Sequence, residues 1–350
     1  LLVLFLIAAA DASAGDKSAY YQNCVNTCLK KTCQNSELLS LRSNFRDCQS
    51  RLFSDILLYK KGMGESVTDQ ILQLARYKNF EFKVIEDLVQ WNCRDECKYQ
   101  CMHKTCEAFI ARKWNIPQFH GKWPFVRLLG FQEPASVFFS ALNFFVHFKG
   151  LMKFRQNVRP DAPLYVHWHA FSFLCLNAWV WSMVFHSRDF PLTELFDYVF
   201  AYSMVLATLW SMLVRTLHGK SKRLTKFVTF VCVIFFLNHF VYLSFNTFDY
   251  NYNMNVNIFT GVLGGIGWVA WCLLQVNKRR YAWKMLLFVI LALSTVVLEV
   301  YDFPPVFWTF DAHSLWHLSS APITILFYKF ITDDCNQLRK EMAVDDKKKL

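Results

Sequence analysis

Charged residues are scarce in most of this 350-residue chain. Asp, Glu, Lys and Arg make up 19% of the sequence, against 54% hydrophobic and 17% aromatic residues. This composition is too apolar for an ordinary soluble enzyme of this length. Residues up to about 122 are mixed and charged, whereas residues 135–330 form a nearly continuous series of hydrophobic segments with short breaks. We therefore expect a polar N-terminal domain followed by a membrane domain.

Basic residues are nearly absent from three of the loops between the hydrophobic segments. The loops after the first, third and fifth segments contain three, five and four Lys or Arg, whereas the three loops between them contain only Arg188. Basic loops stay in the cytosol, so we expect seven spans, a lumenal N-terminal domain and a cytosolic C-terminus. The net charge of +11 then marks topology, and we expect no nucleic-acid partner. The predicted spans are residues 135–152, 163–185, 195–214, 227–245, 256–276, 285–301 and 306–330.

No initiator methionine and no basic segment precede the hydrophobic run at residues 1–10, which an Ala-Ser-Ala cleavage pattern follows at residues 12–14. We interpret residues 1–14 as a secretory signal peptide that is truncated at its start. The predicted domains are then a Cys-rich lumenal domain (15–130), a seven-span membrane domain (131–331) and a cytosolic tail (332–350). Lys347 and Lys348 match the dilysine pattern that retrieves membrane proteins to the endoplasmic reticulum (ER).

The N-terminal domain lacks the two-residue cysteine gaps that are typical of closed zinc sites. Several of its cysteines are instead four residues apart, which places them on one face of a helix. Behind a signal peptide, this pattern predicts a disulfide framework that staples two helices together, with the pairing left open. The eight cysteines are Cys24, Cys28, Cys33, Cys48, Cys93, Cys97, Cys101 and Cys106. Four others are predicted to be free thiols in or beside the spans: Cys175, Cys232, Cys272 and Cys335.

Histidines gather at the lumenal ends of the predicted spans. His186 ends the second span with Ser182 one turn before it, Asp197 begins the third, and His313 and His317 begin the seventh. Ionisable groups inside a membrane are costly and tend to be functional. Three neutral imidazoles leave the fourth position of a zinc ion open, as in catalytic sites. We therefore predict that the three histidines bind a catalytic Zn²⁺.

A zinc ion lowers the pKa of bound water to about 7, so that hydroxide can attack an ester or amide carbonyl. Asp197 is predicted to accept the water proton or to orient a ligand histidine, and Ser182 to donate a hydrogen bond to the developing oxyanion. A Ser-His-Asp triad is the alternative, but the chain lacks a G-x-S-x-G elbow and the last two histidines would have no role. Asp302 and Asp311 are interpreted as helix caps, and His239 as a helix contact.

Seven polar residues of the membrane domain resemble the motif of the CREST superfamily of seven-span hydrolases, which includes the alkaline ceramidases and adiponectin receptors. The resemblance implies a zinc ion held by the three histidines, with Asp197 and Ser182 around the zinc-bound water. The short acidic motif of the ceramidase calcium site is absent, so a calcium site is not expected. The seven residues are Glu133, Asn143, Ser182, His186, Asp197, His313 and His317.

Longer runs are similar to the post-GPI attachment to proteins factor 3 family, and they begin at Cys93, Pro117, Phe131, Leu176, Phe248 and Asp302. This resemblance implies hydrolysis of the sn-2 acyl ester of the phosphatidylinositol in glycosylphosphatidylinositol (GPI) anchors, in the Golgi or ER membrane. Its partners would be GPI-anchored proteins and membrane lipids. A ceramidase-like amidase and a non-enzymatic receptor or scaffold with structural zinc are the alternatives. The expected fold is an all-α seven-span bundle with a disulfide-rich helical lumenal domain.

Overall fold

The computed structural model describes residues 14–33, 91–245 and 249–349. Across these ranges the regular structure is helical, and the only β-type pairing is two isolated bridges. This confirms the all-α class. The chain divides into two compact units, Leu1–Gly130 and Phe131–Leu350, which are described separately below. Residues 1–13 of the predicted signal peptide and Cys48 lie outside the described residues.

Disulfides join the helices of the N-terminal unit. These helices are α1 (Ala14–Lys17), α2 (Ala19–Cys28), the π-helical turn η2 (Leu29–Cys33) and α6 (Cys93–Ala111). The bonded pairs are Cys24–Cys101, Cys28–Cys97 and Cys33–Cys93. Because residue numbers rise along one partner and fall along the other, the two stretches run antiparallel, as a stapled hairpin. The disulfide prediction is thus confirmed for these six cysteines, and the structure supplies the pairing that cysteine spacing left open. It is wrong for Cys106, whose buried thiol is free.

Arg127 holds the segment after α6 against that helix. Its guanidinium carbon lies 3.3 Å from the centroid of the Trp91 ring and 4.1 Å from that of Tyr99. The same group forms an ion pair with Glu96. Aromatic faces and a carboxylate together offset the desolvation of a cation that is only 9% exposed. Within the described residues of this unit, disulfides and the buried Arg127 therefore join the elements.

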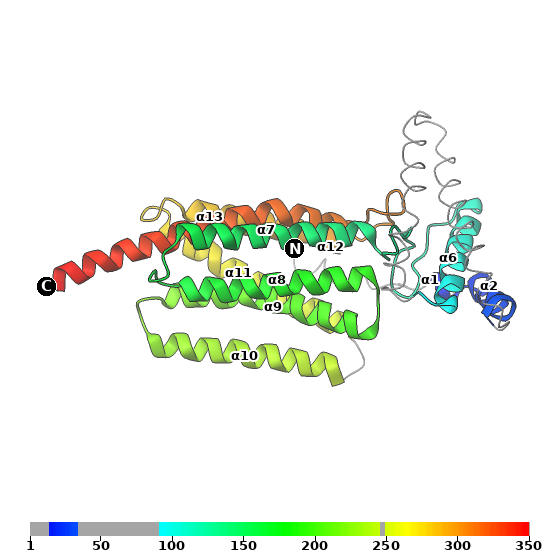
Figure 1. Ribbon diagram of the computed structural model, residues 1–350, viewed down its shortest axis with the longest axis horizontal. Coiled ribbons are helices and arrows are strands. Elements are labelled where there is room, and N and C mark those ends of the chain that lie inside the picture. The colour runs from blue at the N-terminus through cyan, green and yellow to red at the C-terminus, as the bar shows by residue number, and fades with distance from the viewer. Residues whose placement is uncertain (1–13, 34–90, 246–248, 350) are drawn as a thin grey trace, which may run out of the picture. The chain divides into compact units, whose positions relative to one another are not determined.

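Seven long helices form the second unit within the described residues (Figure 1). Contacts run in a ring, α7–α8–α9–α11–α12–α13 and back to α7, and α10 packs on the outside against α9. Short connections place consecutive helices antiparallel, so residues far apart in the sequence meet at one end of the bundle. The helices are α7 (Pro134–Asn157), α8 (Tyr165–Ser187), α9 (Pro191–Leu217), α10 (Lys222–Phe245), α11 (Tyr250–Gln275), α12 (Ala282–Val300) and α13 (Ala312–Lys349).

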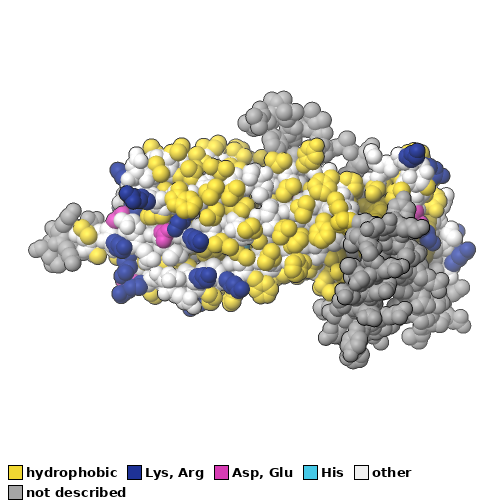
Figure 2. Space-filling model, turned by 90° about the horizontal axis from the view of Figure 1, so that it is seen from above, with side chains coloured by type: hydrophobic (Ala, Val, Ile, Leu, Met, Phe, Trp, Pro, Cys, Tyr) yellow, Lys and Arg dark blue, Asp and Glu magenta, His cyan; other side chains and the backbone are white. Residues whose placement is uncertain are grey.

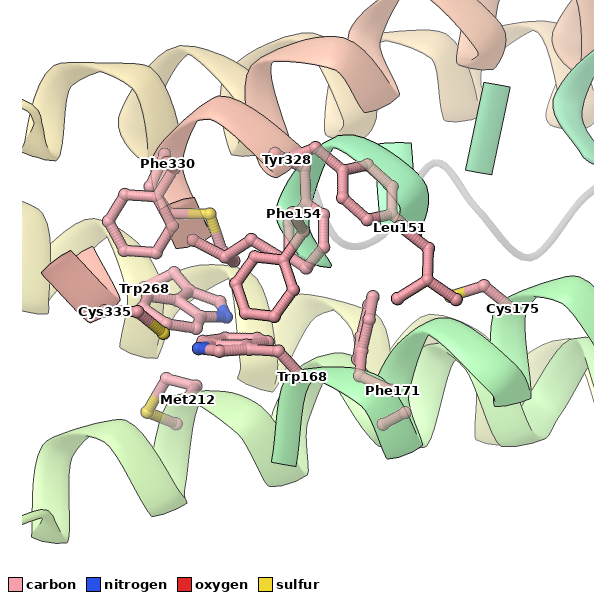
Figure 3. Close-up of a cluster of buried hydrophobic side chains, with 14 of the residues drawn as sticks. Leu151, Phe154, Trp168, Phe171, Cys175, Met212, Trp268, Tyr328, Phe330 and Cys335 are labelled. Atoms are coloured by element: carbon pink, nitrogen blue, oxygen red, sulfur yellow. The ribbon is translucent and has the colours of Figure 1, made fainter. Parts of the chain in front are cut away.

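An aromatic core fills the half of this bundle where α7, α9 and α11 end and α8 begins (Figure 3). Six helices contribute large side chains to it: Phe154, Trp168, Met212, Trp268, Met285 and Phe330. Close packing of this kind fixes the helices relative to one another. The four cysteines predicted to be free thiols are free in the structure, and three of them are buried in this core. The opposite half of the bundle is left for polar groups.

Five helices of the described chain are long and apolar enough to cross a membrane: α7, α9, α10, α11 and α12. The chain is therefore a multi-pass membrane protein by its helices. In Figure 2, hydrophobic side chains cover the middle of the bundle, while Lys and Arg gather at the end from which α13 protrudes. The two remaining long helices, α8 and α13, are not among these five, and both contain histidines and several hydroxyl side chains.

The last helix begins later than the hydrophobic pattern predicts. The expected span starts at residue 306, but residues 306–310 form a closed turn with an isolated bridge, and Phe307 and Trp308 adopt φ of 57° and 58°. That left-handed backbone cannot be part of an α-helix. The helix begins at Ala312 and continues to Lys349, beyond the predicted end of the membrane domain at residue 331. Apolar side chains in a turn were misread as helix.

Candidate metal centre

Three histidines from two helices meet at the polar end of the bundle. His186 lies in the last turn of α8, and His313 and His317 lie in the first turns of α13. The Nε2 atom of His313 is 3.3 Å from Nε2 of His186 and 2.8 Å from Nε2 of His317. These are the three histidines predicted from the sequence as ligands, and together they form a group that could hold a metal ion.

The segment before α7 caps the end of α8. Backbone N–H groups of Gln132 and Glu133 donate to the carbonyl oxygens of Ser187 and His186, at 3.0 Å each. Carbonyls in the last turn of a helix have no partner within that helix. Here the neighbouring segment supplies it. Glu133 is thereby fixed beside His186, with its side chain only 6% exposed.

Each histidine ring is held through its other nitrogen. Nδ1 of His186 lies 2.6 Å from Oε2 of Glu133, and Nδ1 of His313 lies 2.7 Å from Oε2 of Glu299. Carboxylates accept hydrogen bonds, so they assign the proton of both rings to Nδ1. The Nε2 lone pairs of these rings therefore point at the shared centre. Metal-binding histidines in proteins are commonly oriented in this way.

A serine hydroxyl contacts Nδ1 of the third ring, His317, where the other two rings contact carboxylates. Ser140 Oγ is 2.7 Å from the carbonyl oxygen of Ser136, 3.0 Å from Ser182 Oγ and 3.0 Å from Nδ1 of His317. A hydroxyl has one proton and two lone pairs. All three contacts are satisfied when Ser140 donates to Ser136 and accepts from the other two residues. His317 then also has its proton on Nδ1, and the hydroxyl proton of Ser182 points at Ser140.

The backbone of His317 is anchored by Asn143 on α7. Asn143 Nδ2 donates to the carbonyl oxygen of His317 at 2.7 Å, and Ser320 Oγ lies 2.8 Å from the same oxygen. Pro322 lies inside α13, and its missing N–H leaves the carbonyl of Leu318 without its usual helical donor. The side chains of Asn143 and Ser320 thus stabilise α13 at His317, next to the turn that Pro322 weakens.

Asp311 fixes the start of α13 two residues before His313. Its Oδ1 accepts from the backbone N–H of Ser314 at 2.9 Å, and the Ser314 hydroxyl lies 3.1 Å from the backbone nitrogen of Asp311. This reciprocal arrangement is a capping box. The interpretation of Asp311 as a helix cap is therefore confirmed. The cap determines which side of α13 carries the two histidines.

The residues fit a tetrahedral metal ion. Zinc bonds histidine nitrogen at about 2.0–2.1 Å, which separates two tetrahedral ligands by about 3.3 Å. The His186–His313 separation of 3.3 Å matches this value, and the 2.8 Å between His313 and His317 needs a small ring movement. Three unprotonated nitrogens facing one point at these distances repel one another unless a cation lies between them. Donor chemistry and geometry therefore both agree with zinc.

The three candidate ligands differ in burial. His186 and His317 are each 2% exposed, and Ser182 is also buried. The His313 side chain is 32% exposed. His313 is therefore the most exposed of the three rings.

The remaining predicted site residue, Asp197, is half-buried on α9. The Nδ1 contacts to the three rings come from Glu133, Glu299 and Ser140, so none of them involves Asp197. Its role as a base stays a prediction. Sequence reasoning missed Glu299 and Ser140. For Glu299 there was a signal, because a lone carboxylate near the end of a predicted span needs a partner.

The histidines outside the centre have other contacts. His239 is buried on α10, with ring centroids 4.1 Å from Tyr202 and 5.5 Å from Tyr252. His169 on α8 lies with Nδ1 2.8 Å from the carbonyl oxygen of Tyr165. Neither joins the three-histidine group. This agrees with the interpretation of His239 as a helix contact.

Fold and site together define a multi-pass helical membrane protein with a candidate three-histidine metal centre. Sequence comparison narrows this class. The chain belongs to the Per1-like family, whose model matches residues 83–335. No solved structure matches the chain.

Relatives are similar over nearly the whole length. The chain is 42% identical to post-GPI attachment to proteins factor 3 of Drosophila melanogaster, over 95% of this chain and 92% of the relative. It is 38% identical to GPI-specific phospholipase A2-like PGAP3 of Danio rerio, over 94% and 93% of the two chains. The human protein of the same name is 36% identical, over 100% of this chain and 98% of its own length.

Proposed function

We propose that this protein remodels GPI anchors by hydrolysing the sn-2 acyl ester of their phosphatidylinositol, with a zinc ion held by His186, His313 and His317. The observation that carries the proposal is the convergence of three Nε2 atoms whose rings are each held at Nδ1. The names of its relatives, which refer to GPI attachment and to a GPI-specific phospholipase A2-like protein, supply the lipid.

We further propose that α8 and α13 cross the membrane with the five apolar helices, giving seven spans. Both helices are long enough, at 23 and 38 residues. Apart from His313, their polar groups at the metal centre are buried inside the bundle: Ser182, His186, Ser314 and His317. These groups therefore do not form a polar surface that would face lipid. Basic loops at the α13 end favour a lumenal N-terminal domain, in the Golgi or ER.

Hydrolysis joins a water oxygen to the acyl carbonyl carbon and breaks the carbonyl carbon bond to the glycerol oxygen. That glycerol oxygen takes a proton, and the products are a fatty acid and a lyso-anchor. A zinc ion at the three nitrogens would polarise the carbonyl and lower the pKa of water. The chain supplies the rest. Glu133, Glu299 and Ser140 keep the ligand rings in place, and the ester enters beside His313, the most exposed of the three rings.

The contacts of Ser182 support a second role, different from the predicted donation to the oxyanion. Because its proton points at Ser140 (Oγ–Oγ 3.0 Å), it offers lone pairs to the centre. We propose that Ser182 accepts a hydrogen bond from the reacting water rather than donating one to the oxyanion. Asp197 is proposed as the group that receives the proton from that water.

The proposed function is tested by mass spectrometry of GPI lipids from cells that lack their own family member. Cells that express the wild-type protein should release the sn-2 acyl chain of the anchor, and cells that express His186→Ala should keep it. His169→Ala is the matched control, since it removes another histidine of α8, and it should behave as wild type. Purified wild-type protein should also release fatty acid from a diacyl GPI lipid and leave ceramide intact.

Two results would overturn the proposal. Normal remodelling by a correctly trafficked His186→Ala protein would remove the role of the centre and favour a scaffold with structural zinc. Cleavage of ceramide but not of the GPI lipid would instead favour a ceramidase-like amidase.

A further inference from the structure

Glu299 stands near the end of a helix that is otherwise almost free of charge. Between Ala282 and Val300, α12 contains only two charged side chains, Lys284 near its start and Glu299 near its end. A carboxylate in an apolar span is costly to bury and needs a partner. Its partner is His313, with Glu299 Oε2 2.7 Å from Nδ1 and 22% of the Glu299 side chain exposed.

Both charges of α12 contact α13. Lys284 Nζ lies 2.5 Å from Asp333 Oδ2 at the opposite end of the bundle from the histidines. The two ion pairs thus join the same two helices, and their side chains have similar exposure: 32% and 22% for His313 and Glu299, 22% and 39% for Lys284 and Asp333. If the only role of Glu299 were to hold α12 against α13, the two ion pairs would be equivalent. They are not, because only the Glu299 pair contains a candidate metal ligand, His313.

We propose that Glu299 is a positioning residue that fixes the ring of His313 and thereby sets how tightly the centre holds its metal ion. This inference rests on the proposed three-histidine zinc site. Its carboxylate accepts the Nδ1 proton, which keeps the Nε2 lone pair of His313 directed at the other two rings. The negative charge also makes the imidazole a stronger donor to a cation.

His313 depends on its carboxylate more than the other two ligands do. His186 is buried and is held by Glu133 through both ring and backbone. His317 is buried, its ring contacts Ser140, and its carbonyl oxygen contacts Asn143. His313 is partly exposed, so less packing restrains its ring. Removing Glu299 therefore releases the most exposed ligand of the centre.

Metal retention by the purified full-length protein tests this inference. Wild-type protein and Glu299→Gln are dialysed against increasing concentrations of a zinc chelator, and bound zinc is measured by inductively coupled plasma mass spectrometry. Glutamine keeps the shape and one acceptor oxygen but removes the charge. Glu299→Gln should lose zinc at about tenfold lower chelator concentration, and Glu299→Ala at up to about 100-fold lower. Glu299→Asp, which keeps the carboxylate, should retain zinc better than Glu299→Gln.

Asp333→Asn is the matched control, because it makes the same carboxylate-to-amide change in the other pair between α12 and α13. It should release zinc as wild type does. Equal zinc release by wild type and Glu299→Gln would overturn the inference, as would zinc loss by Asp333→Asn as large as that of Glu299→Gln. Wild-type protein without any zinc would overturn the metal site itself. Zinc retention without cleavage of the GPI lipid would overturn only the proposed function.

Discussion

At the scale of single residues, the geometry of the metal centre depends on the side chains that contact the Nδ1 atoms of the three histidines. The three candidate ligands are recognisable in the sequence because histidines at i, i+4 share a helix face and charged or titratable groups are rare in spans. The residues that hold the three rings cannot be recognised in the sequence in the same way. Ser140 resembles any serine that bonds its own helix, and only the meeting of α7 with α13 places its hydroxyl 3.0 Å from His317. Pairings between helices cannot be read from spacing along one of them.

Ser140→Ala should weaken metal binding by about tenfold. The substitution removes the acceptor for the Nδ1 proton of His317 and takes away the hydrogen bond between the hydroxyls of Ser140 and Ser182. Chelator titration of purified protein measures the first effect, and release of fatty acid from a GPI lipid measures both.

Ser203→Ala supplies the comparison for this variant. Ser203 is also a buried membrane serine, but its hydroxyl donates to the backbone oxygen of Phe200 in its own helix. Zinc retention should therefore stay at the wild-type level. If Ser203→Ala loses as much zinc as Ser140→Ala, the effect belongs to helix stability and not to His317.

At the scale of elements, hydrophobic patterning locates the helices but not their ends. The predicted fifth span starts at residue 256, whereas α11 starts at Tyr250, because Asp249 caps it by accepting from the N–H of Tyr252 at 3.0 Å. Asparagines at 251, 253, 255 and 257 mask this turn from a hydropathy reading. A cap is a local signal that was available in the sequence. The Asp311 cap before α13 is a signal of the same kind, because a helix that begins after it excludes residues 306–310.

Close helix contact in the middle of the bundle depends on Gly150. A Cβ atom built there would lie 2.3 Å from Cδ2 of the Tyr328 ring. The Tyr328 hydroxyl bridges two other helices, at 3.2 Å from His147 Nδ1 and 3.1 Å from Ser172 Oγ. Tyr328 is buried and cannot swing into solvent. Small residues let helices approach in this way, and hydrogen bonds between them then add stability.

Gly150→Ala should therefore destabilise the folded protein by about 1–3 kcal/mol, because the ring must move and its hydrogen bonds are lost. The midpoint of thermal unfolding in detergent measures this. Gly261→Ala is the control, since a Cβ there meets only Val205 Cγ1 at an ordinary 3.6 Å. That control should leave the midpoint unchanged or raise it, because alanine favours helix. An unchanged midpoint for Gly150→Ala would show that α7 and α13 can separate without cost.

At the scale of the whole molecule, the proposed seven spans would place the two ends of α8 on opposite sides of the membrane. Two single variants test this, Asp161→Cys before α8 and Leu192→Cys after it. Both positions are exposed. In sealed microsomes with their cytosolic face outward, a membrane-impermeant thiol reagent should label the cysteine at 161. It should reach the cysteine at 192 only after permeabilisation. Mass spectrometry of the labelled peptides separates these sites from the natural cysteines. Labelling of both from the same side would remove α8 from the spans.

The stability of the N-terminal unit is expected to depend on pH through one buried histidine. In the N-terminal unit His103 is 4% exposed, and its ring centroid lies 4.7 Å from that of Tyr99. Burial, with a further contribution from the positive charge of Arg127, lowers the pKa of His103 from 6.5 to about 4. In the unfolded chain, His103 therefore binds a proton near pH 6.5. In the folded unit it binds one only near pH 4. Stability is complete above pH 6.5 and falls as the pH drops from 6.5 towards 4.

Between pH 7.5 and pH 5 this linkage should cost about 2 kcal/mol, and it should raise the population of the opened unit roughly 30-fold. Cys106 reports the opening, because its thiol is buried and burial raises its pKa to about 12. The rate at which a dithiodipyridine labels Cys106 in the full-length protein is compared with the rate in His103→Phe at each pH, which cancels the pH dependence of the thiol itself. The wild-type rate should rise relative to the variant as the pH falls through 6. A constant ratio would mean that His103 is as easily protonated in the folded unit as in the unfolded chain.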